Sequence, residues 1–175
     1  MHVFKGITLI FALLLAVPAA TYAQYDSTPD VVDIAIDSDA HTTLVAAVKA
    51  ADLVSTLKGD GPFTVFAPTN AAFDALPEGT VASLLKPENK ATLQSILTYH
   101  VVAGNLDSEA VVNAIEAGDG KAEVETVQGG TLTAYVSDGK VYLEDEKGNK
   151  AQVTAVDLKG SNGVIHVIDA VVMPE

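Results

Sequence analysis

Two dipeptides late in the sequence constrain the fold of this chain more than any other feature: Gly129-Gly130 and Asp138-Gly139. Each lies between runs in which apolar and polar residues alternate, and two-residue turns of this kind are the strongest short signals for β-hairpins. The stretch 121–145 is therefore expected to form antiparallel strands that are joined by tight turns.

The Asp138-Gly139 turn also predicts a strand register. The expected cross-strand pairs are Val136 with Val141, Tyr135 with Tyr142, and Ala134 with Leu143. In this register the aliphatic residues share one face and the two tyrosines share the other. Extending the same face through Gly129-Gly130 places Val127 opposite Leu132 and turns Glu125 inward. A bulge or an early strand end is therefore expected near Glu125.

Earlier in the chain the patterns are mostly helical. Leu44, Val48 and Ala51 fall on one face of a helical region within residues 30–58. Further helices are expected where capping or first-turn signals occur. These signals are Thr69 or Asn70 before 70–76, Thr80 before 81–86, Pro87 at the start of 87–97, and Ser108 with Glu109 at the start of 108–118.

Strand character appears early only at residues 63–67 and again after Tyr99, and it dominates beyond Gly120. The last strand, 164–168, is apolar on both faces, which is typical of a strand buried in the middle of a sheet. Helices in the N-terminal two thirds and hairpins in the C-terminal third indicate an α+β fold.

The first 23 residues are typical of a secretory signal peptide. Lys5 precedes an apolar stretch and then small residues up to Ala23, so cleavage is expected before Gln24. Residues 24–29 then form a short leader, and 30–174 form a single domain. The apolar stretch is short for a membrane span, and the absence of cysteine fits a bacterial periplasmic or extracellular protein.

Charge excludes one large class of partners. The chain has ten lysines, no arginine and 23 acidic residues, a formal charge of −13 that becomes one unit more negative when Lys5 is removed. Such a chain repels phosphate backbones and anionic lipid surfaces, so no nucleic-acid or membrane-surface binding is expected.

The residues form no catalytic or metal-binding motif. The sequence has no Gly-x-Ser-x-Gly elbow, no phosphate-binding glycine loop and no cysteine. Asp37-Ser38-Asp39 begins like a calcium loop but lacks its glycine and closing glutamate. Residues 144–146 are expected to be a solvated strand edge, with weak surface Ca²⁺ binding as the alternative. No enzyme, cofactor or metal is expected.

The histidines are expected to be mostly structural. His100, at a helix-to-strand junction, and His166, in the most apolar strand, are expected in the core with their ring nitrogens bonded to nearby groups. A proton shuttle or ligand is the alternative for His100. His41, among polar neighbours, is expected to be exposed.

Three stretches, in this order, resemble the fasciclin domain over residues 30–174. They are "FTVFAPTNAAFDAL" (63–76), "ILTYHVV" (96–102) and "SNGVIHVIDAVVMP" (161–174). The first and third resemble the two signature boxes of the domain, and the second resembles its Tyr-His motif. The resemblance implies a β-sandwich-like wedge of about seven strands with a helical layer against it. The matching structural positions are Thr64, Phe66, Pro68, Thr69, Asn70, Phe73, Asn162, Gly163, His166 and Asp169.

The same resemblance implies a function. Fasciclin domains are secreted or surface proteins associated with cell adhesion and matrix contact, so an exported, non-enzymatic interaction module is expected. Its partner would be a cell-surface or matrix protein or polysaccharide, as in surface or biofilm association. The positions linked to recognition are Tyr99 and His100, and a second region reads Asp157-Leu158 where the family has an Asp-Ile type of segment.

A carrier function is the alternative. A minority of algal members resemble carotenoid carriers, and a groove between wedge and helices could hold a carotenoid or another small apolar ligand. The chain is rich in alanine and valine, which would leave such a groove or simply pack the core.

Overall fold

The computed structural model describes residues 28–174, so the expected signal peptide and most of the leader lie outside the described residues. The helical elements are α1 (Val31–Ile36), η1 (Asp39–His41), α2 (Thr42–Ala50), α3 (Val54–Leu57), α4 (Asn70–Asp74), α5 (Thr80–Leu84), η2 (Pro87–Asn89), α6 (Lys90–Tyr99) and α7 (Ser108–Ala117). The strands are β1 (Phe63–Pro68), β2 (Val101–Ala103), β3 (Lys121–Glu125), β4 (Thr131–Ser137), β5 (Lys140–Glu144), β6 (Lys150–Gly160) and β7 (Gly163–Ile168).

The described strands form one mixed sheet in the order β2-β1-β7-β6-β5-β4-β3. β1 and β7 run parallel, and the other neighbours are antiparallel. β7 therefore has a partner on each side, and Val164–Ile168 are all buried. This confirms the expectation of a central last strand.

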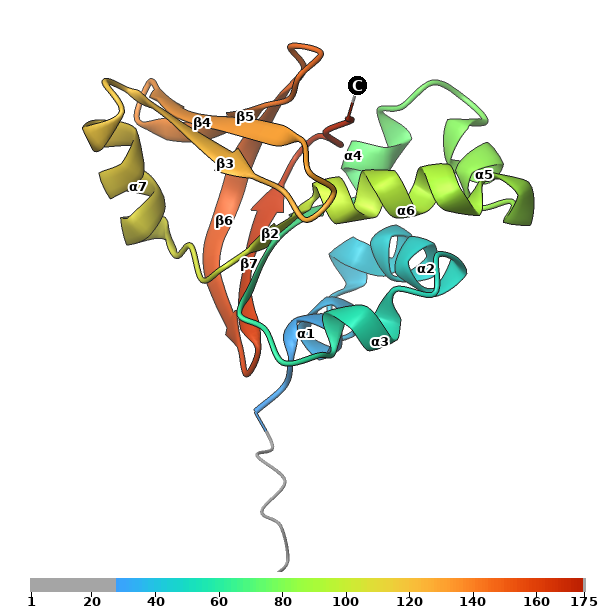
Figure 1. Cartoon of the computed structure of the whole chain (residues 1–175). Coiled ribbons are helices and arrows are strands. Elements are labelled where there is room, and N and C mark those ends of the chain that lie inside the picture. The colour runs from blue at the N-terminus through green and yellow to red at the C-terminus, as the bar shows by residue number, and fades with distance from the viewer. Residues whose placement is uncertain (1–27, 175) are drawn as a thin grey trace, which may run out of the picture.

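The sheet curls nearly into a barrel and does not form the expected two-sheet sandwich. β6 carries register shifts between Val153 and Ala155 and again between Ala155 and Leu158, and such bulges bend a strand. The two edge strands then approach each other, since Val102 of β2 forms a bridge with Thr126 just after β3. In Figure 1, β3, β4 and β5 fold over β6 and β7 in this way, with α7 on one side and the other helices opposite.

Of the two predicted hairpin registers, one is confirmed and one was wrong. The pairs Val136–Val141, Tyr135–Tyr142 and Ala134–Leu143 all form. The register through Gly129-Gly130 was wrong, because Val124, and not Val127, lies opposite Leu132. The early strand end at Glu125 is confirmed. The loop is longer than a two-residue turn because the Val127 amide donates to the Val101 carbonyl across the barrel seam (2.7 Å).

Three helix starts follow the predicted signals to within one residue, whereas Pro87 begins the short 3-10 helix η2 and α6 starts only at Lys90. Thr69 is the N-cap of α4, since its Oγ1 accepts the Ala72 amide at 3.3 Å. For α5 the N-cap is Gly79, one residue before Thr80. For α7 it is Asp107, one residue before Ser108. Ser108 cannot serve as the cap because its amide and hydroxyl both donate to Asp157.

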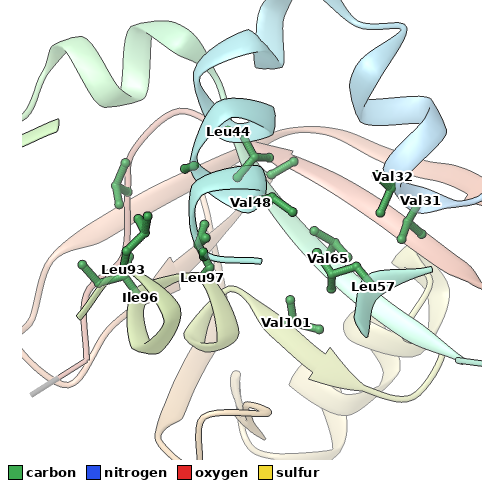
Figure 2. Packing of buried hydrophobic residues seen from close by; sticks show 14 of the residues in the cluster. Val31, Val32, Leu44, Val48, Leu57, Val65, Leu93, Ile96, Leu97 and Val101 are labelled. Carbon is green, nitrogen blue, oxygen red and sulfur yellow. The ribbon is translucent and has the colours of Figure 1, made fainter. Parts of the chain in front are cut away.

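The curled sheet has a separate hydrophobic core on each side. Toward α1–α6, Val65 and Ile165 pack with Leu44, Val48 and Leu97, as Figure 2 shows for several of these side chains. Inside the curl lies a second cluster of Phe66, Tyr99, Val102, Val111, Ile115, Ala122, Leu132, Ala134, Leu143, Ala151, Ile168 and Val172. Alternation along β1 supplies both cores, because successive side chains point to opposite faces of a strand.

Candidate functional site

Tyr99, the last residue of α6, joins that helix to both hairpin ends. Its side chain is completely buried (0 % exposed). The hydroxyl donates to the Thr131 carbonyl at 2.7 Å and accepts the Glu146 amide at 3.3 Å. Its ring also requires a glycine at 130, because a Cβ there would lie 2.7 Å from a ring carbon. These contacts make Tyr99 an internal tie between α6 and the ends of β4 and β5.

His100 is also internal (3 % exposed). Its Nδ1 lies 2.8 Å from the Ile96 carbonyl, which only accepts, so Nδ1 carries the proton. Nε2 then accepts the Val172 amide at 3.3 Å. Burial lowers the pKa of His100 to about 4, against the opposing effects of the Ile96 carbonyl and the charge of Asp145. At neutral pH the ring is a neutral link between α6 and the C-terminal segment, as expected of a core histidine.

Asp157 lies at the bulge of β6 and holds α7. Its backbone has a φ of 59°, in the left-handed region that aspartate tolerates better than most residues. Its carboxylate accepts the Ser108 amide at 2.8 Å and the Ser108 hydroxyl. These two bonds lower the pKa of Asp157 against a smaller opposing effect of burial, and the charge of Lys159 adds to the lowering. Asp157 therefore fixes the start of α7 against the bulge, while Leu158 beside it is 38 % exposed.

Apolar side chains surround this bulge at the surface. Val141 and Val153 line one shallow hollow with Val156, which is 44 % exposed. Val136 is the cross-strand partner of Val141 and is exposed to the same extent. We call these four valines the apolar patch. Leu158 lies opposite Ile165 of the helical-side core, so its side chain belongs to the other face of β6. The sequence does not reveal this patch, because Val136 and Val141 alternate with polar residues as core residues do.

His166 forms the floor of the same hollow. It stacks on Phe66 with ring centroids 5.7 Å apart, and its Nε2 donates to the Leu106 carbonyl at 2.7 Å. The proton on Nε2 leaves Nδ1 as a buried acceptor without a protein partner. His166 is therefore a core histidine as expected, but with one ring nitrogen satisfied and not two.

The remaining residues of the first signature box connect β1 to its surroundings. Thr64 is buried, and its hydroxyl donates to Gly104 and accepts the Leu106 amide, both within 2.8 Å. Pro68 and Phe73 are buried in the core. Asn70 does not cap its own helix: its Oδ1 accepts the Thr43 amide in the first turn of α2, at 3.0 Å.

The second box connects the N-terminal end of the described chain to the β6–β7 turn. The Asn162 side chain accepts the Val31 amide at 3.1 Å and donates to the Leu57 carbonyl at 2.7 Å. Gly163 lies so close to β1 that a Cβ would fall 2.0 Å from the Phe63 carbonyl oxygen. Asp169 accepts the Gln152 amide at 2.7 Å. The two signature boxes are thus parts of one framework.

Two residues expected at the surface are buried. His41 is in the core because the η1 turn carries its ring inward, where burial lowers its pKa against a smaller effect of the Ala67 carbonyl. Asp145 is buried because its carboxylate accepts the amides of Lys147, Asn149 and Met173 at 2.8–3.0 Å. The expectation of a solvated edge therefore holds for Glu146 but was wrong for Asp145.

The groove expected for an apolar ligand is largely filled. Between α1–α3 and the sheet lies an apolar cavity of about 40 Å³, lined by Val31, Leu44, Val48, Leu57, Val65, Val101 and His100 among others. An engineered cavity that binds benzene measures about 150 Å³. The two candidate regions are therefore separate: His100 borders this inner cavity, whereas Asp157 adjoins the apolar patch.

Two further features of residues 28–174 bear on other types of site. No group of three or more acidic, histidine or cysteine side chains is arranged to hold a metal ion there. In the same part of the chain, none of the helices has both the length and the apolar character to cross a bilayer.

Comparisons with known proteins agree with these motifs. The fasciclin domain model matches residues 39–174. Protein sll1483 of Synechocystis is 53 % identical over 152 residues, which cover 87 % of this chain and 77 % of that protein. The cell surface glycolipoprotein MPB83 of Mycobacterium bovis is 40 % identical over 123 residues, 70 % of this chain and 48 % of that protein.

A solved structure shows the same fold. It is a FAS1 domain pair from the insect cell adhesion molecule Fasciclin I, with a TM-score of 0.50 and 21 % identity over 73 % of this chain and 40 % of that chain. Sequence motifs, family match and fold therefore agree: this chain belongs to the fasciclin domain family.

Proposed function

We propose that the protein is an exported, non-enzymatic interaction module that binds a cell-surface or matrix protein through the apolar patch. The observation that carries the proposal is the exposure of Val136 and Val156, 44 % each, on the face of the sheet next to a bulge that Asp157 holds in place. Exposed apolar residues grouped on a rigid support are typical of protein contact sites. Relatives named for the cell surface and for cell adhesion support this assignment.

In this proposal Tyr99 and His100 support recognition indirectly. Both side chains are buried, so a partner reaches them only through the segments that they position. Tyr99 holds the ends of β4 and β5, and these two strands also carry Val136 and Val141 of the apolar patch. The recognition role of the Tyr-His motif is therefore to keep the hairpin that carries part of the patch in place.

The carrier alternative has less support. A carotenoid is many times larger than a cavity of about 40 Å³, so the helices α1–α3 would have to move away from β1 to admit one. Native mass spectrometry of protein from its own producer tests this: a discrete small adduct on the mature chain would favour the carrier.

The experiment for the module is binding of labelled protein, residues 24–175, to whole cells of the producing organism. Val136→Asp and Val156→Asp place a charge in the apolar patch, and we expect each to weaken binding about tenfold or more, as for central contact residues. Val127→Asp is the matched control, because Val127 is 46 % exposed but lies in the β3–β4 loop. Equal losses in all three variants, or none, would reject the apolar patch as the contact site.

A further inference from the structure

The outer face of the β3–β6 half of the sheet carries a row of side chains that neither core uses. Lys121 lies opposite Tyr135, Tyr135 opposite Tyr142, and Tyr142 opposite Gln152, so the row crosses all four strands. The inner face of the same strands carries the buried Ala122, Ala134, Leu143 and Ala151. With strands about 4.8 Å apart, the row is about 14 Å long.

Two aromatic rings form the centre of this row. The rings of Tyr135 and Tyr142 lie within 20° of parallel, with centroids 5.7 Å apart, and both residues are only half-buried. Elsewhere in residues 28–174, Phe66, Phe73 and Tyr99 are buried, and Phe63 packs against the helical-side core. The tyrosine pair is therefore the aromatic surface that the described chain leaves accessible.

Ammonium groups surround the pair. The Lys150 Nζ lies 5.5 Å from the centroid of the Tyr135 ring, a cation–π distance, and 4.0 Å from Glu144. Lys140 donates to the Gln152 side chain at 3.2 Å. Among the described residues, no carboxylate lies within ion-pair distance of Lys121 or Lys140, in contrast to Lys58 with its two aspartates. In this acidic chain, the ends of the tyrosine row thus carry two lysines that have no ion-pair partner among the described residues.

The combination fits a polymer with flat, apolar ring faces and widely spaced carboxylates. Aromatic rings pack against apolar ring faces, while lysine and glutamine side chains donate to carboxylates and hydroxyls. Densely charged polymers fit poorly, because Glu123, Glu125 and Glu144 share this face, and double-stranded DNA carries a charge about every 1.7 Å. A uronic-acid polysaccharide, with about one carboxylate per sugar, matches this charge spacing better.

We infer that the tyrosine face, defined as Lys121, Tyr135, Lys140, Tyr142, Lys150 and Gln152, binds an acidic polysaccharide. Sugar rings pack on the tyrosine pair, and uronate carboxylates pair with Lys121 and Lys140. The face is distinct from the apolar patch, whose Val136 and Val141 belong to the opposite face of the same two strands. One domain can therefore hold a protein on one face and an acidic polysaccharide on the other.

The test is binding of the mature chain, residues 24–175, to immobilised alginate, with dextran as the neutral polymer. We expect binding to alginate at about 50 mM NaCl that weakens strongly at about 500 mM, because exposed charge pairs are screened. The double variant Lys121→Gln/Lys140→Gln should bind about tenfold more weakly, as should Tyr142→Ser. The control double variant Lys49→Gln/Lys159→Gln changes the net charge equally, at exposed lysines outside the face, and should bind within about twofold of wild type.

Each other outcome overturns the inference. Absence of alginate binding, equal binding to dextran, or equal loss in the control double variant would each contradict it. Tighter binding to single-stranded DNA or to vesicles with anionic lipid would assign the face to another class of partner. Val156→Asp should retain alginate binding, so a failure here is distinguishable from a failure of the apolar patch.

Discussion

Tyr99-His100 and Asp157-Leu158 are both dipeptides that the family resemblance marks for recognition, yet the fold places them in opposite environments. The first pair is completely enclosed, and its polar atoms bond to backbone groups of α6, the hairpin ends and the C-terminal segment. The second pair lies on a bulge at the surface, where Asp157 bonds to α7 and Leu158 faces solvent.

The difference separates two ways in which a residue can matter for binding. Substituting a buried residue changes stability first and binding as a consequence, because the apolar patch depends on the framework. Substituting an exposed residue on the bulge can change binding while the fold is kept. Loss of adhesion after substitution at the Tyr-His motif is therefore weak evidence for contact unless stability is measured in the same variant.

The largest expected effect comes from Tyr99→Ala, which should lower the free energy of unfolding by about 3–5 kcal/mol because it leaves a large internal cavity. Tyr99→Phe keeps the ring and should cost only about 1 kcal/mol for the lost hydroxyl bonds. Urea unfolding monitored by circular dichroism measures both. Tyr142→Ala is the matched control, since the same side chain is half-exposed there, and a cost of about 1 kcal/mol or less is expected. Similar losses of unfolding free energy in Tyr99→Ala and Tyr142→Ala would contradict the assignment of Tyr99 to the internal framework.

The next effect is a pH dependence from His100. Its folded pKa of about 4 lies below the ordinary value of 6.5, so between these values the unfolded chain binds the proton and the folded one does not. Stability is therefore full above pH 6.5 and is lost as the pH falls toward 4. As the pH falls from 6.5 to 5, proton uptake by His100 in the unfolded chain should lower the free energy of unfolding by about 2 kcal/mol.

Urea unfolding at several pH values tests this, with His100→Gln as the comparison. The variant should be less stable at pH 7, yet its stability should fall less between pH 6.5 and 5 than that of wild type. His41 and His166 remain in both proteins, so the difference in slope reports His100. Parallel curves for the two proteins would show that His100 does not titrate as a buried group.

The smallest effects are expected at the bulge. In Asp157→Asn, the asparagine can adopt the same φ of 59° but forms weaker bonds to Ser108. We therefore expect the free energy of unfolding to fall by about 1 kcal/mol. Leu158→Ser removes an exposed side chain and should change stability by no more than about 0.5 kcal/mol. Thermal unfolding followed by circular dichroism distinguishes these values. A cost at Leu158 that equals or exceeds the cost at Asp157 would mean that Leu158 serves the fold and not contact.

Local signals predicted much of the fold. Asp138-Gly139 predicted the β4–β5 register, because a two-residue turn leaves no freedom in pairing. Thr69 predicted the start of α4, since an N-cap acts on amides two or three residues away. The Gly129-Gly130 register failed where a distant strand intervened, because the bond from Val127 to Val101 is not visible locally.

The sequence predicted which residues belong to the candidate site, but not which of them lie at the surface. Tyr99, His100, Asp157 and Leu158 could be named from the motif, but their exposure depends on which segments cover them. Val136 shows the limit most clearly. Its position in the alternation is that of a core residue, yet it is 44 % exposed, whereas Ala134 on the same face is buried in one cluster with Val111 and Ile115 of α7.

The sequence by itself determined the family, the positions of most helices and strands, and the acidic character from which no nucleic-acid binding is expected, because these depend on local pattern and composition. The tertiary structure alone decided that the strands curl into one near-barrel, that Asp145 and His41 are buried, and that valines surround the bulge. Those properties arise from bonds and contacts between segments far apart in the chain, such as Asp145 with Met173 and Ser108 with Asp157. A local sequence pattern does not show which distant backbone groups will bond to a given side chain in the folded protein.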